Sequence, residues 1–248
     1  MSEIDAVYKK VVQLVQAQRF KEANTALLPF LRTSNALVFR ARYLLSSHKA
    51  SPSYSAKESK KILDGLCKLN DSWGNVEKGR CLLNGIFYAR DTFNAEDFLM
   101  RAKDVEPRAV YLLADIHGNG LHRDEDGKQV YDLTMSTEMY LELSKTNTAY
   151  KELATINYCR LMMDKGNLSP DDKRVIFNML TGLMENKQPG AYSLYVNFLA
   201  EELNAMSRTL FSSPEGNSFA EKQTETLGKN QYNNAVKQIK KLITNKDG

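Results

Sequence analysis

The two histidines closest together in the sequence suggest metal chemistry first. His117 and His122 are five residues apart, with Asp115, Asp124 and Asp126 nearby. Imidazole and carboxylate groups are common ligands of zinc and related divalent ions. Their spacing matches no known site geometry, so we predict no metal here. A metal-dependent enzyme centred on this cluster is kept only as an alternative.

Other patterns resemble catalytic or cofactor motifs but lack essential parts. His122-Arg123-Asp124 has the letters of a kinase catalytic loop, yet Gln129 replaces the expected asparagine and no glycine-rich loop precedes it. Gly118-Asn119-Gly120 lacks the third glycine of a dinucleotide fingerprint and is typical of a helix stop. The three cysteines have no C-x-x-C pairing and no evident histidine base, which favours buried free thiols over a nucleophile. The sequence therefore predicts a protein that is not an enzyme and uses no cofactor.

The composition excludes several classes of function. The 248 residues include 34 basic and 30 acidic residues, interspersed to a net charge of +4, which provides no strong field for nucleic acid or anionic lipid. No stretch approaches the apolar length of a membrane span. Charged residues interrupt residues 1–17, so these lack the apolar run of a signal peptide and we expect a cytoplasmic protein. An exported envelope or secretion-system scaffold is the alternative.

Apolar residues recur at three- and four-residue spacing almost throughout, without a convincing run of period-two alternation. This predicts helix pairs whose units start about 30 to 41 residues apart, which brackets the tetratricopeptide period. One pair cannot cover its own apolar face, so neighbouring pairs must stack. We therefore predict an all-α fold, an α-solenoid of about five to six helix-turn-helix repeats with a C-terminal capping or arm helix. Expected helices lie near 4–15, 23–31, 37–45, 55–69, 76–87, 94–105, 107–116, 135–143, 150–161, 170–184 and 191–210.

Local signals support these helix boundaries. Pro29 is predicted to tighten or end the second helix, and Pro107 suits a first helical position. Ser55 and Glu58 have the spacing of a capping box. Asn94 is predicted to cap the helix that follows it.

Residues Ala109 to Gly120, AVYLLADIHGNG, resemble the first helix and glycine turn of the Sel-like repeat (SLR), a relative of the tetratricopeptide repeat. That pattern has an alanine, a leucine before a small residue, a hydrophobe, an aromatic and a glycine-rich turn. Here His117 takes the aromatic place. Similar segments lie at 79–87, 149–158 and 191–198, within a likeness that extends over residues 34–200. The resemblance implies a scaffold or adaptor that binds partner proteins, often in bacterial assemblies, and it supplies no catalytic residues.

The chain changes character near its C-terminus. We predict a helical-repeat superhelix over residues 1–206, then a polar linker and a basic amphipathic helix over 207–248. Lys237, Lys240 and Lys241 of this arm are the predicted partner-binding residues. The expected partner is a protein, with no small-molecule substrate and no nucleic acid. A nucleic-acid binder and a homo-oligomer formed through the open ends of the stack remain alternatives.

Overall fold

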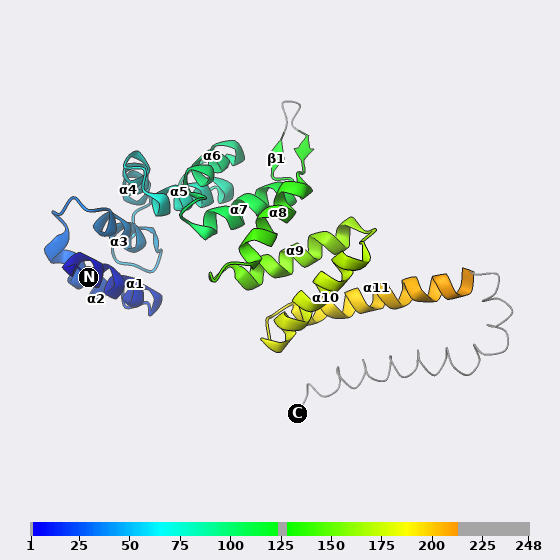
Figure 1. Cartoon of the computed structure of the whole chain (residues 1–248). Helices are drawn as coiled ribbons and strands as arrows, with labels where there is room; N and C mark the ends of the chain where they lie inside the picture. Colours follow the sequence, from blue (N-terminus) through cyan, green and yellow to red (C-terminus); the bar gives the residue numbers. More distant parts are fainter. Residues whose placement is uncertain (1, 124–127, 213–248) are drawn as a thin grey trace. The chain divides into compact units, whose positions relative to one another are not determined.

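The computed structural model describes residues 2–123 and 128–212 (Figure 1). These residues form eleven α-helices, one short 3-10 helix and one two-stranded hairpin. The chain divides into two compact units, residues 1–173 and 174–248. The predicted all-α helical-repeat fold is confirmed.

Helices of the first unit pack as successive antiparallel pairs, and the second helix of a pair also contacts the first helix of the next pair. The pairs are α1 (Glu3–Gln16) with α2 (Phe20–Leu27), α3 (Ala36–Ser47) with α4 (Ala56–Lys68), α5 (Ser72–Asn84) with α6 (Thr92–Ala102), and α7 (Pro107–Gly118) with α8 (Leu133–Ser144). Helix α9 (Lys151–Lys165) packs on α8. Helix α10 (Pro170–Glu185) begins in the first unit and continues in the second, which also contains α11 (Ala191–Ser212).

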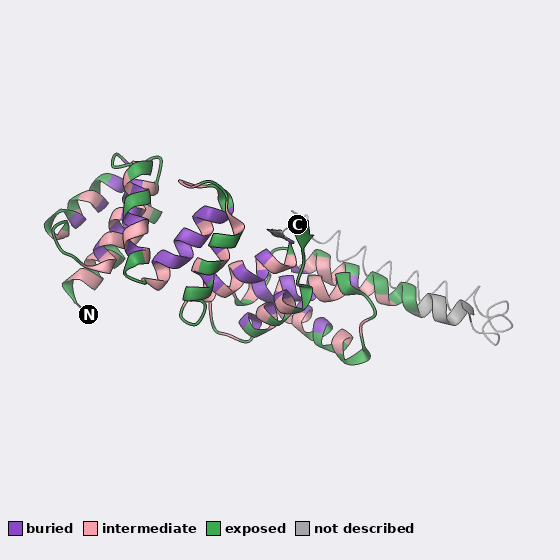
Figure 2. Ribbon diagram, turned by 90° about the horizontal axis from the view of Figure 1, so that it is seen from above, coloured by how far each residue is buried: buried purple, intermediate pink, exposed green. Residues whose placement is uncertain are grey.

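Apolar residues on one face of most helices build the core and the opposite faces are exposed, whereas α5 is buried along most of its length (Figure 2). The first unit contains three consecutive apolar clusters, centred on α1 to α3, α3 to α5 and α5 to α8. Each buried leucine contributes about 1.5–3 kcal/mol relative to exposure. Representative fully buried members are Val11, Leu63, Leu66, Leu99, Leu113 and Ile116.

Most of the predicted helix signals are confirmed. Pro29 lies in the 3-10 helix Leu28–Phe30 that follows α2, and Pro107 begins α7. The Ser55 side chain accepts a hydrogen bond from the Glu58 backbone N–H and caps α4, which is the first half of the predicted capping box. The second half does not form, because the Ser55 backbone N–H donates to the Ser46 carbonyl at 2.8 Å and Glu58 pairs with Arg42.

The predicted cap of α6 was wrong. Asp91, three residues before Asn94, occupies the N-cap position, and its carboxylate accepts the Asn94 backbone N–H at 3.0 Å. A carboxylate at this position satisfies an otherwise unpaired N–H and complements the positive end of the helix. Helix α6 therefore begins at Thr92, and Asn94 lies inside its first turn.

The polar insertion between α7 and α8 contains a feature that the helical pattern did not predict. Strand β1 (His122–Arg123) pairs antiparallel with β2 (Gln129–Val130). Strands of two residues are too short to show alternation in the sequence. Gly120, at φ +58°, leads into the hairpin, and a Cβ at this residue would lie 2.5 Å from the Tyr131 ring.

Two further predictions concern the C-terminal part of the chain. The C-terminal helix and Lys237, Lys240 and Lys241 lie outside the described residues. The boundary at residue 206 stays a prediction. None of the helices in the described residues is both long and apolar enough to cross a membrane.

Gly79 permits the close approach of α5 to α6, so Gly79→Ala tests this packing. The added Cβ would lie 2.7 Å from Leu99 Cγ and 3.1 Å from the Ala95 carbonyl oxygen. We expect the substitution to lower the free energy of unfolding by about 1–3 kcal/mol, measured by urea denaturation. As a control, Gly65→Ala adds a methyl group with no atom within 4 Å. This control should gain up to about 1 kcal/mol from helix propensity. Equal effects of the two substitutions would contradict the packing role.

Candidate functional site

The histidine and aspartate predicted as metal candidates on α7 have other neighbours in the structure. His117 Nε2 lies 3.4 Å from Glu96 Oε1 of α6. Asp115 accepts a hydrogen bond from the Tyr140 hydroxyl of α8. Asp124 and Asp126 lie outside the described residues. Within residues 2–123 and 128–212, no three His, Cys, Asp or Glu side chains form a group that could hold a metal ion.

The cysteines are free thiols in unreactive surroundings. Cys81 and Cys159 are buried, as predicted, and Cys67 is half-buried. Burial raises the pKa of Cys67 and of Cys159 to about 12, so both are protonated at neutral pH. Because the thiolate is the nucleophilic form, these residues are poorly suited to covalent chemistry.

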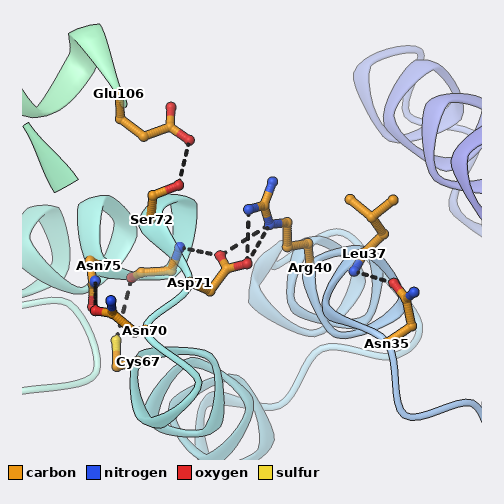
Figure 3. A network of polar contacts seen from close by, with 10 residues as sticks. Asn35, Leu37, Arg40, Cys67, Asn70, Asp71, Ser72, Asn75 and Glu106 are labelled. Carbon is orange, nitrogen blue, oxygen red and sulfur yellow. Dashed lines mark hydrogen bonds and ion pairs between the residues drawn. The ribbon is translucent and has the colours of Figure 1, made fainter. Parts of the chain in front are cut away.

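A charged cluster joins α3 to the start of α5 (Figure 3). The Asp71 carboxylate caps α5 by accepting the Gly74 backbone N–H at 2.8 Å. It also accepts hydrogen bonds from Arg40, at 2.8 Å from Nη2 and 3.1 Å from Nε. The same guanidinium lies over the Trp73 ring, 5.6 Å from its centre. One carboxylate thus fixes both the start of a helix and the position of an arginine.

A second cluster joins α5 to α7 through Glu77, whose side chain is only 7% exposed. Glu77 Oε2 accepts from Arg80, at 2.8 Å from Nη2 and 3.0 Å from Nε. Glu77 Oε1 accepts from Arg108 Nη1. The two arginine side chains are 30% and 34% exposed. One buried carboxylate therefore holds two guanidinium groups that remain partly in solvent, and the trio has a net charge of +1.

A third cluster joins α7 to α9 around Tyr111. Its ring centre lies 5.7 Å from that of Tyr140 and 5.5 Å from that of Tyr150. Its hydroxyl accepts a hydrogen bond from Asn157 Nδ2 at 3.0 Å, and Asn157 Oδ1 accepts from Arg160 Nη2. Burial raises the pKa of Tyr111, so the phenol stays protonated at neutral pH.

These three clusters lie one after another along the first helices of the pairs, and together they form a surface that is mostly half-buried, with Glu77 and Asn157 buried and Arg160 exposed. On α5 and on α7 the residues involved are three or four positions apart, so each set shares one face of its helix. The clusters connect these faces from α3 to α9. We call this surface the first-helix strip; its members are Arg40, Trp73, Glu77, Arg80, Arg108, Tyr111, Tyr150, Asn157 and Arg160.

The sequence did not predict the strip. The predicted binding residues, Lys237, Lys240 and Lys241, lie outside the described residues. One available signal was the spacing of Trp73, Glu77 and Arg80, which places large polar or amphipathic side chains on one face of an otherwise buried helix. Their partners on other helices have no such local signal.

The comparisons with known proteins identify the fold. No protein-family model and no curated protein matches the sequence. The crystal structure of a Sel1 repeat protein from Oxalobacter formigenes is similar, with a TM-score of 0.57 and 14% sequence identity. The match covers 76% of this chain and 73% of that chain. The predicted resemblance to Sel-like repeats is thus confirmed for the fold.

Glu77→Gln tests the carboxylate that holds the two arginines. The neutral amide loses both ion pairs and turns its NH₂ group toward one guanidinium. We expect a loss of about 2 kcal/mol in the free energy of unfolding, because the partly exposed arginines can regain water. Glu22→Gln is the matched control, since the Arg19–Glu22 pair is more than half exposed. It should leave the free energy of unfolding unchanged in the same urea titration, because an exposed ion pair adds little to stability. Equal losses of unfolding free energy in the two variants would show that the burial of Glu77 adds nothing to the strength of its ion pairs.

Asp115→Asn should change stability in a pH-dependent way. Burial raises the pKa of Asp115, although the Tyr140 hydrogen bond and Arg160 oppose this effect. A carboxyl whose pKa is higher in the folded chain destabilises the fold when charged, and this cost disappears as the pH falls below the ordinary pKa. The asparagine is neutral at every pH, and its oxygen can still accept from Tyr140.

We therefore expect urea denaturation to show a more stable variant at neutral pH and no difference at about pH 3. Asp104→Asn, at an exposed carboxylate, is the control and should show no such gain. A stability difference that does not change with pH would contradict the burial effect.

Proposed function

We propose that this chain is a scaffold that binds a segment of a partner protein along the first-helix strip. The observation that carries the proposal is the strip's composition. It contains the only tryptophan of the chain, two tyrosines and four arginines. Tryptophan, tyrosine and arginine are the residue types enriched at the positions that dominate the binding energy of protein interfaces.

The geometry of the strip supports this use. Asp71 and Glu77 are each 7% exposed and hold Arg40, Arg80 and Arg108 in place. Side chains that are already ordered lose less conformational entropy when a partner binds. Binding therefore does not require the strip to rearrange.

The positions of the cavities favour a protein segment, rather than a small molecule, as the ligand of the strip. One cavity of about 420 Å³ lies between the start of α6 and the hairpin, lined by Phe93, Leu121 and Gln129 among others. Another of about 380 Å³ lies at the turn between α1 and α2. Neither of these two cavities is lined by a residue of the strip.

Finer parts of the proposal rest on the sequence. They are a cytoplasmic location, a place in a bacterial multiprotein assembly, and a second contact through Lys237, Lys240 and Lys241. The proposed role is not catalytic and requires no cofactor.

Photo-crosslinking in the native host tests the proposed site. A benzoylphenylalanine replaces Trp73 or Arg160 on the strip, or Lys57 or Lys61 on the exposed face of α4. We expect the strip positions to capture the same partner protein, and the α4 positions not to capture it. Capture of the same proteins at all four positions would contradict the proposal that the strip is the binding site.

With the captured partner in hand, calorimetry on the purified proteins measures the contribution of one arginine. Arg108→Ala should weaken binding at least about tenfold, the effect of an interface hot spot. Arg42→Ala is the matched control, because Arg42 is 31% exposed and pairs with Glu58 of α4. Its affinity should equal that of the wild type, and an equal loss in both variants would contradict the proposal.

A further inference from the structure

Three large apolar side chains are exposed at the same place in successive repeats. Leu31, Leu69 and Val105 are 42%, 64% and 71% exposed. Each lies in the turn that leads from the second helix of a pair into the first helix of the next pair, α3, α5 or α7. Isolated exposed apolar residues are ordinary on protein surfaces. Their recurrence in three consecutive turns is a pattern.

These turns belong to one edge of the stack. Paired helices run antiparallel, so every turn from a second helix to the next first helix lies at the same edge. Side chains near Leu69 contact the neighbouring first helix and the next turn. Asp71 binds Arg40 of α3, and the Ser72 hydroxyl donates to Glu106 Oε1 at 3.2 Å (Figure 3). We call Leu31, Leu69 and Val105 the turn row.

The turns do not need these apolar side chains for their own folding. The backbone N–H of Leu69 donates to the Gly65 carbonyl at 3.2 Å, and that of Val105 donates to the Ala102 carbonyl at 3.1 Å. Caps on the side chains of Asn35 and Asp71 start the helices that follow. Because most of Leu69 and Val105 is in water, their side chains contribute little to the core.

Basic residues accompany each member of the row. Arg32 and Lys68 are the sequence neighbours of Leu31 and Leu69, and Lys103 lies two residues before Val105. All three are exposed, and none forms an ion pair within the described parts of the chain. Asp104 is the exposed carboxylate in these turns, Glu106 is half-buried and accepts from Ser72, and Asp71 is paired with Arg40, so basic groups still outnumber the unpaired acidic ones. The edge thus combines apolar and positively charged groups.

We propose that the turn row binds an acidic segment of another protein. The apolar side chains of the bound segment cover Leu31, Leu69 and Val105. The carboxylates of the segment lie opposite the three basic residues. A nucleic acid fits less well, because the row has no aromatic side chain on which bases could stack. The row shares no residue with the first-helix strip, so this proposal goes beyond the proposed function and can fail independently of it.

Binding of designed peptides to the full chain tests the proposal. The probes are fluorescein-labelled peptides of about 20 residues, long enough to cross three repeats. Each peptide carries leucines at one fixed interval, of three, four or seven residues, and glutamates at positions between the leucines. We expect at least one to bind, measured by fluorescence anisotropy. The matching peptides with lysine for glutamate, or serine for leucine, should bind at least tenfold more weakly.

Surface variants locate the binding site. The double variant Leu69→Ser and Val105→Ser should lose at least tenfold in affinity while its circular dichroism is unchanged. Leu133→Ser, at a residue 45% exposed on α8, is the control and should bind as the wild type does. The double variant Lys68→Glu and Lys103→Glu should bind the glutamate peptide more weakly than the wild type does, and the lysine peptide more tightly.

Three results would overturn the proposal. The first is that none of the leucine and glutamate peptides binds more tightly than its lysine counterpart. The second is equal binding by the wild type and the Leu69→Ser, Val105→Ser variant. The third is that this edge binds a single-stranded oligonucleotide or anionic phosphatidylserine vesicles in preference to the peptides. Arg108→Ala should leave peptide binding unchanged, which separates a failure here from a failure of the strip.

Discussion

Each helix pair of this chain has an apolar face that only the next pair can cover. The second helix of a pair contacts the first helix of its successor from α2 through α9. The buried side chains of the first unit accordingly form consecutive clusters rather than one central core. Close packing at Gly79 shows how little space separates the helices of one pair. Stacking leaves one side of every first helix outside the apolar core, and this side carries the polar clusters.

Buried carboxylates organise this polar side. Asp71 and Glu77 each connect one helix pair to another, and each uses an arginine from a neighbouring first helix. Such pairs add little net stability, since both charges must be removed from water. Their main effect is geometric, because they fix the guanidinium groups relative to helices that the apolar contacts have already placed. The positions of the strip's arginines therefore depend on the same stacking that forms the core.

The helices could be predicted from the sequence because each contains its own signal. Apolar spacing, Pro107 and Ser55 depend on residues within one turn of helix. The cap of α6 was assigned to Asn94 because two polar residues suited to capping lie three positions apart, and the spacing alone did not favour Asp91. The strip was not predictable because its contacts join residues 31 or 46 positions apart. Nothing near Glu77 in the sequence indicates Arg108.

The turns between pairs separate the residues that start a helix from those that stay exposed. Asp71 starts α5, holds Arg40 and lies two residues after Leu69, whose side chain contributes to neither task. A turn that needed only to fold could use a small polar residue in place of Leu69. Loss of Asp71 would disturb the helix start, the arginine and the edge at once, whereas a change at Leu69 affects the surface alone. The exposed positions of the turns are thus not constrained by the fold, while the capping positions are, and this freedom is what the proposed binding at the turn row would use.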